Sequence, residues 1–142
     1  MVSLVLIGHS SALLHALRAM IAQAAPAVPV ATAGGTAAGN LGTSSPAFLD
    51  ALRAGLAASG GDGVVVLFDL GSAAMALEMA VEELSPADRA LVAVSDGPLV
   101  EGAVRASVEA AGGAARLQVL AAADAERRTA KLPPDWLAGL DA

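Results

Sequence analysis

The sequence has no cysteine, one lysine and few aromatic residues. Without cysteine, disulfides and thiolate metal ligands are excluded, and an intracellular location is the simpler interpretation. Lys131 is the single lysine and the formal net charge is −6, so the chain lacks the positive charge that a nucleic-acid-binding surface requires. No apolar run approaches the ~20 residues of a membrane span, and residues 1–8 lack a basic leader. We therefore expect a cytoplasmic protein that binds neither nucleic acid nor membrane.

The motifs of common nucleotide, hydrolase and metal sites are also missing. The glycine-rich loop 34–44 contains no lysine, which excludes a P-loop, and neither strand-to-helix turn carries the G-x-G-x-x-G of dinucleotide binding. Neither Ser10 nor Ser72 lies in the G-x-S-x-G pattern of a nucleophile elbow. His9 and His15 have no carboxylate or thiol at ligand spacing, so no zinc site is expected. The sequence predicts no bound cofactor and no metal.

What the sequence does contain is an alternation of short aliphatic runs and helical patterns. Its 142 residues suggest one domain with a core of small aliphatic side chains. The runs predict strands over residues 4–7, 28–31, 63–69 and 91–94, a short final strand over residues 116–120, and helices over residues 12–24, 45–56, 72–84 and 100–111. This alternation predicts a three-layer α/β/α fold with a mostly parallel sheet of order 2-1-3-4 plus the short C-terminal strand. We expect one domain over residues 1–122 and a tail over residues 123–142.

Two polar residues follow the most apolar strands. His9 comes directly after the first strand and Asp69 ends the third. In this strand order the two residues meet at the crevice outside the carboxyl ends of the strands. A carboxylate that accepts one ring N–H fixes the imidazole tautomer and leaves the other nitrogen as a nucleophile or base. Alternatively, His9 simply hydrogen-bonds its loop and Asp69 only caps the following helix.

Neutral hydrogen-bond donors surround this pair in the sequence. Gly71 and Ser72 open a helix whose unpaired N–H groups suit an anion, and Ser10 and Thr43 add hydroxyl groups. The residues therefore favour a phosphate at this site, with His9 and Asp69 as catalytic residues and with Ser10, Gly71, Ser72 and Thr43 as phosphate-binding residues.

Several segments together resemble one family. They are the strand ending in His9-Ser10-Ser11, the Gly-Gly-Thr loop that continues to residues 41–44, the Asp-Leu-Gly-Ser-Ala turn at residues 69–73, and the Pro-Leu-Val-Glu-Gly-Ala segment at residues 98–103. Over about residues 1–120 the chain resembles the DhaM family, the phosphotransferase subunits of the bacterial dihydroxyacetone kinase that uses phosphoenolpyruvate. The fold of that family is similar to the mannose-type enzyme IIA of the sugar phosphotransferase system (PTS).

The resemblance implies a phosphoryl relay. His9 matches the phosphorylated histidine, which would accept the group from the phosphohistidine of HPr and pass it to ADP on the subunit DhaL. Asp69 matches the acid that orients this histidine. A third subunit, DhaK, binds the dihydroxyacetone that the resulting ATP phosphorylates, and a homodimer is expected. In many relatives the loop after Gly-Gly-Thr carries acidic and basic residues where this chain has Ala37, Ala38 and Asn40.

Two other functions fit the same residues. One is a mannose-type enzyme IIA that serves a sugar permease. The other is a non-catalytic regulatory module of the same fold, which would retain its activity when His9 is replaced by alanine.

Overall fold

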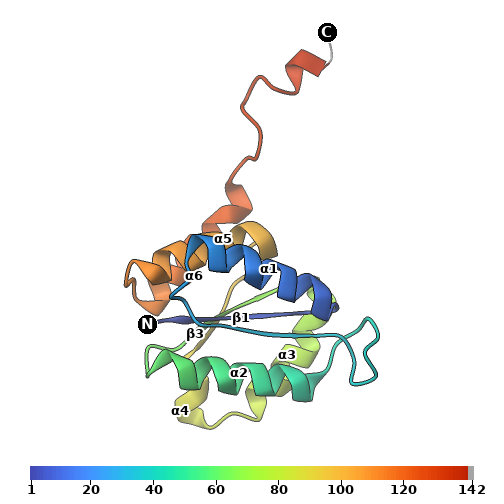
Figure 1. The fold of residues 1–142 in the computed structure, drawn as a ribbon, viewed down its shortest axis with the longest axis vertical. Helices are drawn as coiled ribbons and strands as arrows, with labels where there is room; N and C mark the ends of the chain where they lie inside the picture. The colour runs from blue at the N-terminus through green and yellow to red at the C-terminus, as the bar shows by residue number, and fades with distance from the viewer. Residues whose placement is uncertain (141–142) are drawn as a thin grey trace.

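Strand β1 (Ser3–Gly8) lies in the middle of the sheet, and all of its residues are buried. The computed structural model describes residues 1–140, and within them the sheet has four parallel strands in the order β2-β1-β3-β4 (Figure 1). Around β1 lie β2 (Val30–Gly34), β3 (Val64–Phe68) and β4 (Val92–Val94). The α/β class and the strand order expected from the sequence are confirmed.

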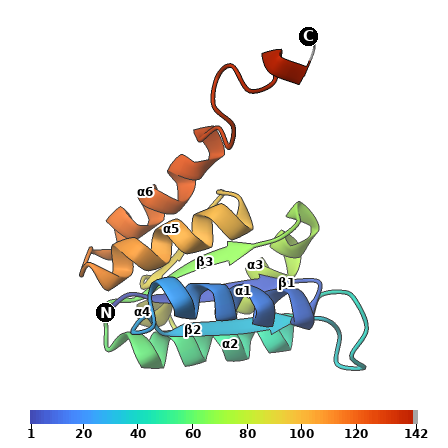
Figure 2. The same ribbon diagram turned by 45° about the horizontal axis from the view of Figure 1, so that its top comes forward.

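Helices cover both faces of the sheet (Figures 1 and 2). One face carries α1 (Ser11–Ala24), α5 (Leu99–Ala111) and α6 (Arg116–Ala125), and the other carries α2 (Ser45–Ser59) and α3 (Ala74–Glu82), with the short α4 (Pro86–Arg89) before β4. Side chains of β1 alternate between the two cores, since Leu4 and Leu6 pack toward α1 whereas Val5 and Ile7 pack toward α2. The sheet is therefore buried on both faces, which explains its continuous aliphatic strands.

Serine residues mark where the first two long helices begin. The hydroxyl of Ser10 accepts the N–H of Leu13 at 3.2 Å, and that of Ser44 accepts the N–H of Ala47 at 3.3 Å. Pro46 occupies the first turn of α2, where its missing N–H costs nothing. These caps set the start of each helix just after the loop that follows a strand's carboxyl end.

The expected short strand over residues 116–120 is wrong, because these residues begin α6. A strand would place Leu117 and Val119 on one face, but Val119 is buried with Ala123 at helical spacing while Leu117 is exposed. Gln118 stabilises the helix start, since its side chain accepts the N–H of Ala115 at 3.0 Å. The alternating run from Arg116 to Leu120 is too short to distinguish the periodicity of a strand from that of a helix.

Other boundaries move by a few residues. β2 begins at Val30 rather than at residue 28, because the N–H of Val28 bonds to the carbonyl of Ala25 and Pro29 has no N–H to donate. The helix expected over residues 72–84 is divided into a 3-10 turn η1 (Gly71–Ala73) followed by α3.

The C-terminal segment leaves the body of the protein. Helix α6 continues past residue 122 to Ala125 and is followed by the 3-10 turn η2 (Glu126–Arg128). Residues 129–140 then run away from the sheet and include the 3-10 turn η3 (Ala138–Leu140) (Figures 1 and 2). Lys131 forms an ion pair with Glu101 of α5, which ties the beginning of this segment to the domain. Within residues 1–140, no helix has the length and apolar character needed to cross a membrane.

Candidate active site

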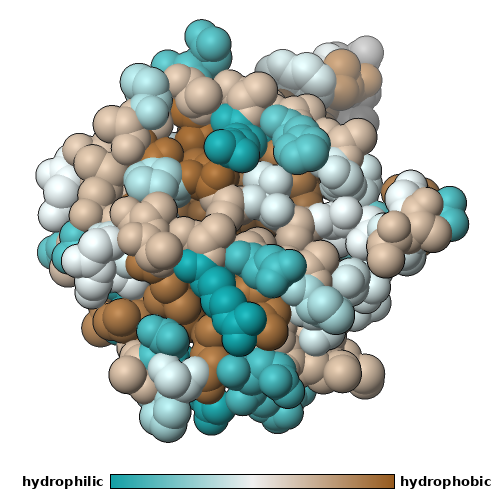
Figure 3. Space-filling model, turned by 60° about the horizontal axis from the view of Figure 1, so that its bottom comes forward, coloured by the Kyte–Doolittle hydropathy of each residue, from teal (hydrophilic) through white to brown (hydrophobic). Residues whose placement is uncertain are grey.

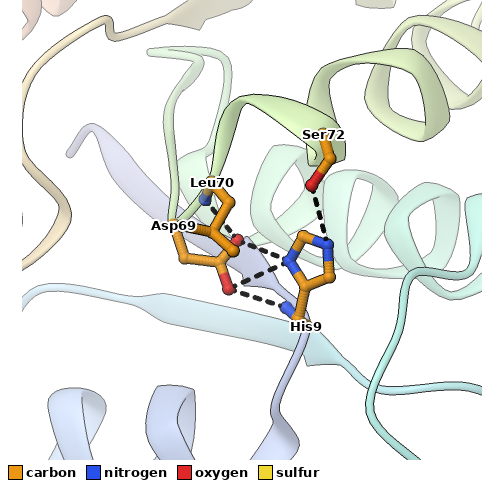
Figure 4. A network of polar contacts seen from close by, with 4 residues as sticks. All are labelled: His9, Asp69, Leu70 and Ser72. Carbon is orange, nitrogen blue, oxygen red and sulfur yellow. Dashed lines mark hydrogen bonds and ion pairs between the residues drawn. The ribbon is translucent and has the colours of Figure 1, made fainter.

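His9 and Asp69 lie at the carboxyl ends of adjacent central strands. Ile7 of β1 pairs with Phe68 of β3, so the residues that follow these strands emerge side by side. Figure 4 shows the imidazole of His9 between the Asp69 carboxylate and the Ser72 hydroxyl. The strand order brings together these residues from distant parts of the sequence, as expected.

Two backbone N–H groups and one ring nitrogen lie within hydrogen-bond distance of the Asp69 carboxylate. The backbone N–H of His9 donates to Oδ2 at 2.8 Å, and the backbone N–H of Leu70 donates to Oδ1 at 2.6 Å. The ring Nδ1 of His9 lies 3.0 Å from Oδ1 and 3.2 Å from Oδ2. Burial alone would raise the pKa of Asp69, but the hydrogen bonds from His9 and Leu70 outweigh burial and hold this pKa below its ordinary value. The carboxylate is therefore ionised at neutral pH.

An ionised carboxylate can only accept hydrogen bonds, so the proton between it and His9 belongs to Nδ1. In the neutral ring, Nε2 then carries the lone pair, and it lies 3.0 Å from the Ser72 hydroxyl, which donates to it. The side chain of Asp69 is 11% exposed and that of His9 is 26% exposed. The carboxylate of Asp69 is thus shielded, while the imidazole of His9 is accessible from solvent.

Gly8 is a site residue that sequence reasoning missed. A Cβ atom at Gly8 would lie 2.6 Å from both Cγ and Oδ2 of Asp69, a separation that Cβ atoms in proteins essentially never show. Only glycine lets the end of β1 approach the carboxylate so closely. The signal was present in the sequence as a glycine between a buried strand and the histidine.

The other predicted phosphate-binding residues lie in different segments, which follow the carboxyl ends of β1, β2 and β3. Ser10 caps α1, with its hydroxyl bonded to Leu13, and Gly71 opens η1 next to Ser72. Thr43 lies in the loop before α2, and the neighbouring Gly42 donates its N–H to the His9 carbonyl at 3.0 Å. This bond fixes the loop beside the histidine. Ser72 alone among these four residues contacts the imidazole in the hydrogen-bond network of residues 1–140.

The chemistry available to this site is that of an oriented imidazole. Within the part of the chain that the structure describes, no group of three His, Cys, Asp or Glu side chains is placed to hold a metal ion. The N–H groups of Gly71 and Ser72 bond to no other group among residues 1–140, and they begin the helical segment that continues as α3. An accessible Nε2 that contacts the hydroxyl of Ser72, at the start of this segment, suits attack on, and retention of, a phosphoryl group.

Comparisons with known proteins show which family the chain resembles. A family model described as the PTS system fructose IIA component matches residues 3–120. The phosphoryl donor subunit DhaM of the phosphoenolpyruvate-dependent dihydroxyacetone kinase 2 of Listeria innocua is 32% identical over 110 residues, which cover 77% of this chain and 86% of that protein. The corresponding DhaM of Escherichia coli K12 is 33% identical over 118 residues, covering 80% of this chain and 24% of that protein. The chain thus matches only about a quarter of the E. coli protein.

A solved structure has a similar fold. The crystal structure of EF1359, a protein of unknown function, superposes with a TM-score of 0.74 at 28% sequence identity, covering 87% of this chain and 94% of that chain. The similarity extends over nearly all of the described fold.

Proposed function

The chain belongs to the EIIA-man family of PTS IIA components, and on that basis we propose that it is a phosphohistidine carrier in which Nε2 of His9 holds the phosphoryl group. The observation that carries the proposal is the contact of Nδ1 with the Asp69 carboxylate. Because this contact takes one ring nitrogen, the accessible Nε2 is the nitrogen that can attack phosphorus.

The proposed transfer needs only the donor phosphohistidine and the imidazole of His9. The lone pair of Nε2 attacks the phosphorus of a donor phosphohistidine, the Nε2–P bond forms, and the donor N–P bond breaks so that its electrons return to the donor ring. Nδ1 of His9 keeps its proton, and the ring becomes positively charged. The Asp69 carboxylate balances this charge, and catalysis comes from positioning and electrostatics. In the second step a β-phosphate oxygen of ADP attacks the phosphorus, and the neutral ring of His9 leaves.

Neutral donors would hold the phosphoryl oxygens. When Nε2 is phosphorylated, its bond from Ser72 is lost, and the Ser72 hydroxyl can turn to donate to a phosphoryl oxygen instead. The free N–H groups of Gly71 and Ser72 add donors at the beginning of a helical segment, where the backbone dipoles favour an anion. Ser10, which follows β1, and Thr43, in the loop after β2, complete the proposed set.

The names of the relatives support a role in the phosphorylation of dihydroxyacetone. They are phosphoryl donor subunits of dihydroxyacetone kinases, and we propose the same role here. HPr would be the donor and ADP on DhaL the acceptor, so that the chain acts as a phosphotransferase component and supports dihydroxyacetone phosphorylation on DhaK indirectly. We further propose a cytoplasmic homodimer, with residues 1–122 as the phosphocarrier domain and residues 123–142 as a tail.

A relay experiment tests this function. The wild-type protein is incubated with phosphoenolpyruvate, enzyme I and HPr at mildly alkaline pH, where phosphohistidine survives, and its intact mass is measured. We expect one acid-labile phosphate that is discharged when DhaL and ADP are added. His15→Ala should behave like the wild type, whereas His9→Ala should acquire no phosphate; these two residues are the only histidines.

The other outcomes separate the alternatives. A phosphoprotein that ignores DhaL with ADP but passes its phosphate to a permease component would indicate a sugar-transport IIA protein. A wild-type protein that acquires no phosphate from competent HPr would contradict the carrier function and favour a regulatory module.

A further inference from the structure

The backbone of His9 is held on both sides of its Cα atom. Its N–H donates to Oδ2 of Asp69 at 2.8 Å, and its carbonyl accepts the N–H of Gly42 at 3.0 Å. Gly42 lies in the loop of residues 35–44, which connects β2 to α2 and projects from the body of the molecule (Figures 1 and 3). A segment far from His9 in the sequence therefore bonds to the backbone of the residue proposed to carry the phosphoryl group.

The beginning of this loop lies against the next peptide group. A Cβ atom at Gly34, the last residue of β2, would lie 2.8 Å from both the carbonyl carbon and the carbonyl oxygen of Ser10. Only a residue without a side chain allows β2 to end so close to this carbonyl. The two ends of the loop thus contact successive peptide groups, because Gly34 packs on the carbonyl of Ser10 and Gly42 bonds to that of His9.

Thr36 closes the projecting part of the loop on itself. Its N–H donates to the carbonyl of Asn40 at 2.8 Å, and its hydroxyl accepts the N–H of Asn40 at 3.2 Å. Its carbonyl accepts the N–H of Gly39 at 2.9 Å. Since these bonds join the side chain and backbone of one residue to the backbone three and four residues later, they give the segment a defined shape.

Thr36 also leaves no room for a side chain at Gly42. A Cβ atom at Gly42 would lie 2.8 Å from Cγ2 of Thr36, and the φ angle of Gly42 is +145°, a conformation that favours glycine. The methyl group of Thr36 therefore lies beside the residue whose N–H reaches His9. We call these contacts of Thr36 and Gly42 the loop brace.

We propose that the loop brace orients His9 through its backbone carbonyl, and that Thr36 is a positioning residue for phosphoryl transfer, acting through Gly42. The proposal rests on the proposed function of His9. Because a peptide group is planar, the direction of the imidazole depends on the dihedral angles on both sides of the Cα atom. Asp69 binds the N–H side and Gly42 binds the carbonyl side. A displacement of about 1 Å at a reacting group can cost about 10²-fold in rate, so both bonds should matter.

Two glycines of the loop provide a matched pair of variants. Gly42→Ala must displace Thr36 or the N–H that bonds to His9, whereas a Cβ atom at Gly39 would meet nothing within 4 Å. Gly39 also has a positive φ angle, +82°, so Gly39→Ala controls for backbone strain and keeps the N–H that bonds to Thr36. Phosphorylation of His9 is measured with two donors, phosphorylated HPr and the small molecule phosphoramidate. Circular dichroism and thermal unfolding establish that each variant is folded.

The brace should affect the chemical step with either donor. For Gly42→Ala we expect kcat to fall about tenfold with both donors and KM to stay within about twofold, since orientation of His9 matters in the transition state. Gly39→Ala should stay within about twofold of the wild type in kcat. Adding Thr36→Ser to Gly42→Ala removes the methyl group that the new Cβ atom would meet, so the double variant should recover part of the lost rate.

Thr36→Val tests the brace without changing a glycine, because it keeps the side-chain shape and removes the hydroxyl that binds Asn40. The readout is the NMR coupling across the hydrogen bond between the Gly42 nitrogen and the His9 carbonyl carbon. We expect this coupling to weaken in Thr36→Val and in Gly42→Ala, together with kcat, and to persist in Thr36→Ser and Gly39→Ala.

The contrary results are distinct. Wild-type kcat in Gly42→Ala, or a lost coupling without loss of rate, would overturn the brace and leave the carrier function intact. A defect with HPr alone, confined to KM, would also overturn it, because the loop would then contact the donor protein rather than orient His9. If neither donor phosphorylates His9 of the wild type, the proposed function fails and the brace fails with it.

Discussion

The carboxylate of Asp69 occupies the space that a Cβ atom at Gly8 would need. Its Oδ2 atom would lie 2.6 Å from such a Cβ atom. The missing side chain at Gly8 therefore allows the end of β1 to approach the carboxylate that binds His9. The same approach lets the backbone N–H of His9 reach Oδ2 of Asp69 at 2.8 Å. Backbone and side chain of one residue thus bind the same carboxylate, which fixes the imidazole with respect to the sheet.

Gly8→Ala should damage the site although it adds a single methyl group. The methyl group must displace the Asp69 carboxylate, and overpacking of this kind costs about 1–3 kcal/mol of the free energy of unfolding. A misplaced imidazole should also slow phosphorylation by up to about 10²-fold. Denaturant unfolding and the HPr transfer rate measure the two effects.

The matched control for this variant is Gly112→Ala. Gly112 has a helical backbone conformation, and an added Cβ would meet its nearest neighbour at 3.4 Å. Its free energy of unfolding should stay within about 0.5 kcal/mol of the wild type. Gly8→Ala behaving like this control would contradict the close approach of Gly8 to Asp69.

Asp69→Asn should remove a pH-dependent part of the stability. The folded-state pKa of Asp69 is lowered, so its stabilising contribution is present above the unfolded value of about 3.9 and is lost as pH falls through the lower folded value. The wild type should therefore exceed the variant in free energy of unfolding at neutral pH, and the difference should shrink below about pH 4. Urea unfolding from acid to neutral pH measures it. A difference that stays constant over the whole range would contradict this assignment.

Asp69→Asn should also impair transfer. An amide cannot balance the positive charge of the phosphorylated ring and does not enforce the tautomer with the proton on Nδ1, so we expect the phosphorylation rate to fall roughly 10²–10⁴-fold. Rapid-quench measurement with phosphorylated HPr gives the rate. Transfer at the wild-type rate would show that Asp69 only caps the following turn.

Ser72→Ala should shift the equilibrium between the free and phosphorylated protein. In the free protein the Ser72 hydroxyl donates to Nε2, and in the phosphoprotein it would donate to a charged oxygen, which is the stronger bond. Losing it should disfavour the phosphoprotein by about 1 kcal/mol, or roughly fivefold in the exchange equilibrium with HPr. Ser72→Thr keeps the hydroxyl and should restore the wild-type equilibrium. An unchanged equilibrium in Ser72→Ala would exclude Ser72 as a phosphate ligand.

The sequence predicted the fold best where a strand is buried on both of its faces. The aliphatic run before His9 and the run before Asp69 predicted central parallel strands, and these strands place the two residues side by side. The C-terminal region was less predictable, because the alternation at Arg116 to Leu120 covers little more than one helical turn. Val119 and Ala123 pack against the sheet at helical spacing, which stabilises the helix α6 rather than a strand.

Within the site, residue types were predictable and contacts were not. The pairing of His9 with Asp69 followed from strand order, and Ser72 followed from its place at a helix start. Which ring nitrogen meets the carboxylate depends on the rotamer of His9 and on the backbone N–H groups of His9 and Leu70, which no sequence pattern encodes. The same is true of the space at Gly8, which exists only once β1 and β3 are paired.

The most direct measurement is the bonding of phosphorus in the phosphorylated protein. The protein labelled with ¹⁵N at its histidines is phosphorylated through HPr, and phosphorus–nitrogen couplings are recorded by NMR at mildly alkaline pH, with His15→Ala assigning the signals. We expect coupling to Nε2 of His9 and a proton retained on Nδ1. Phosphorus bonded to Nδ1 of His9, or to either nitrogen of His15, would contradict the role assigned to the Asp69 contact.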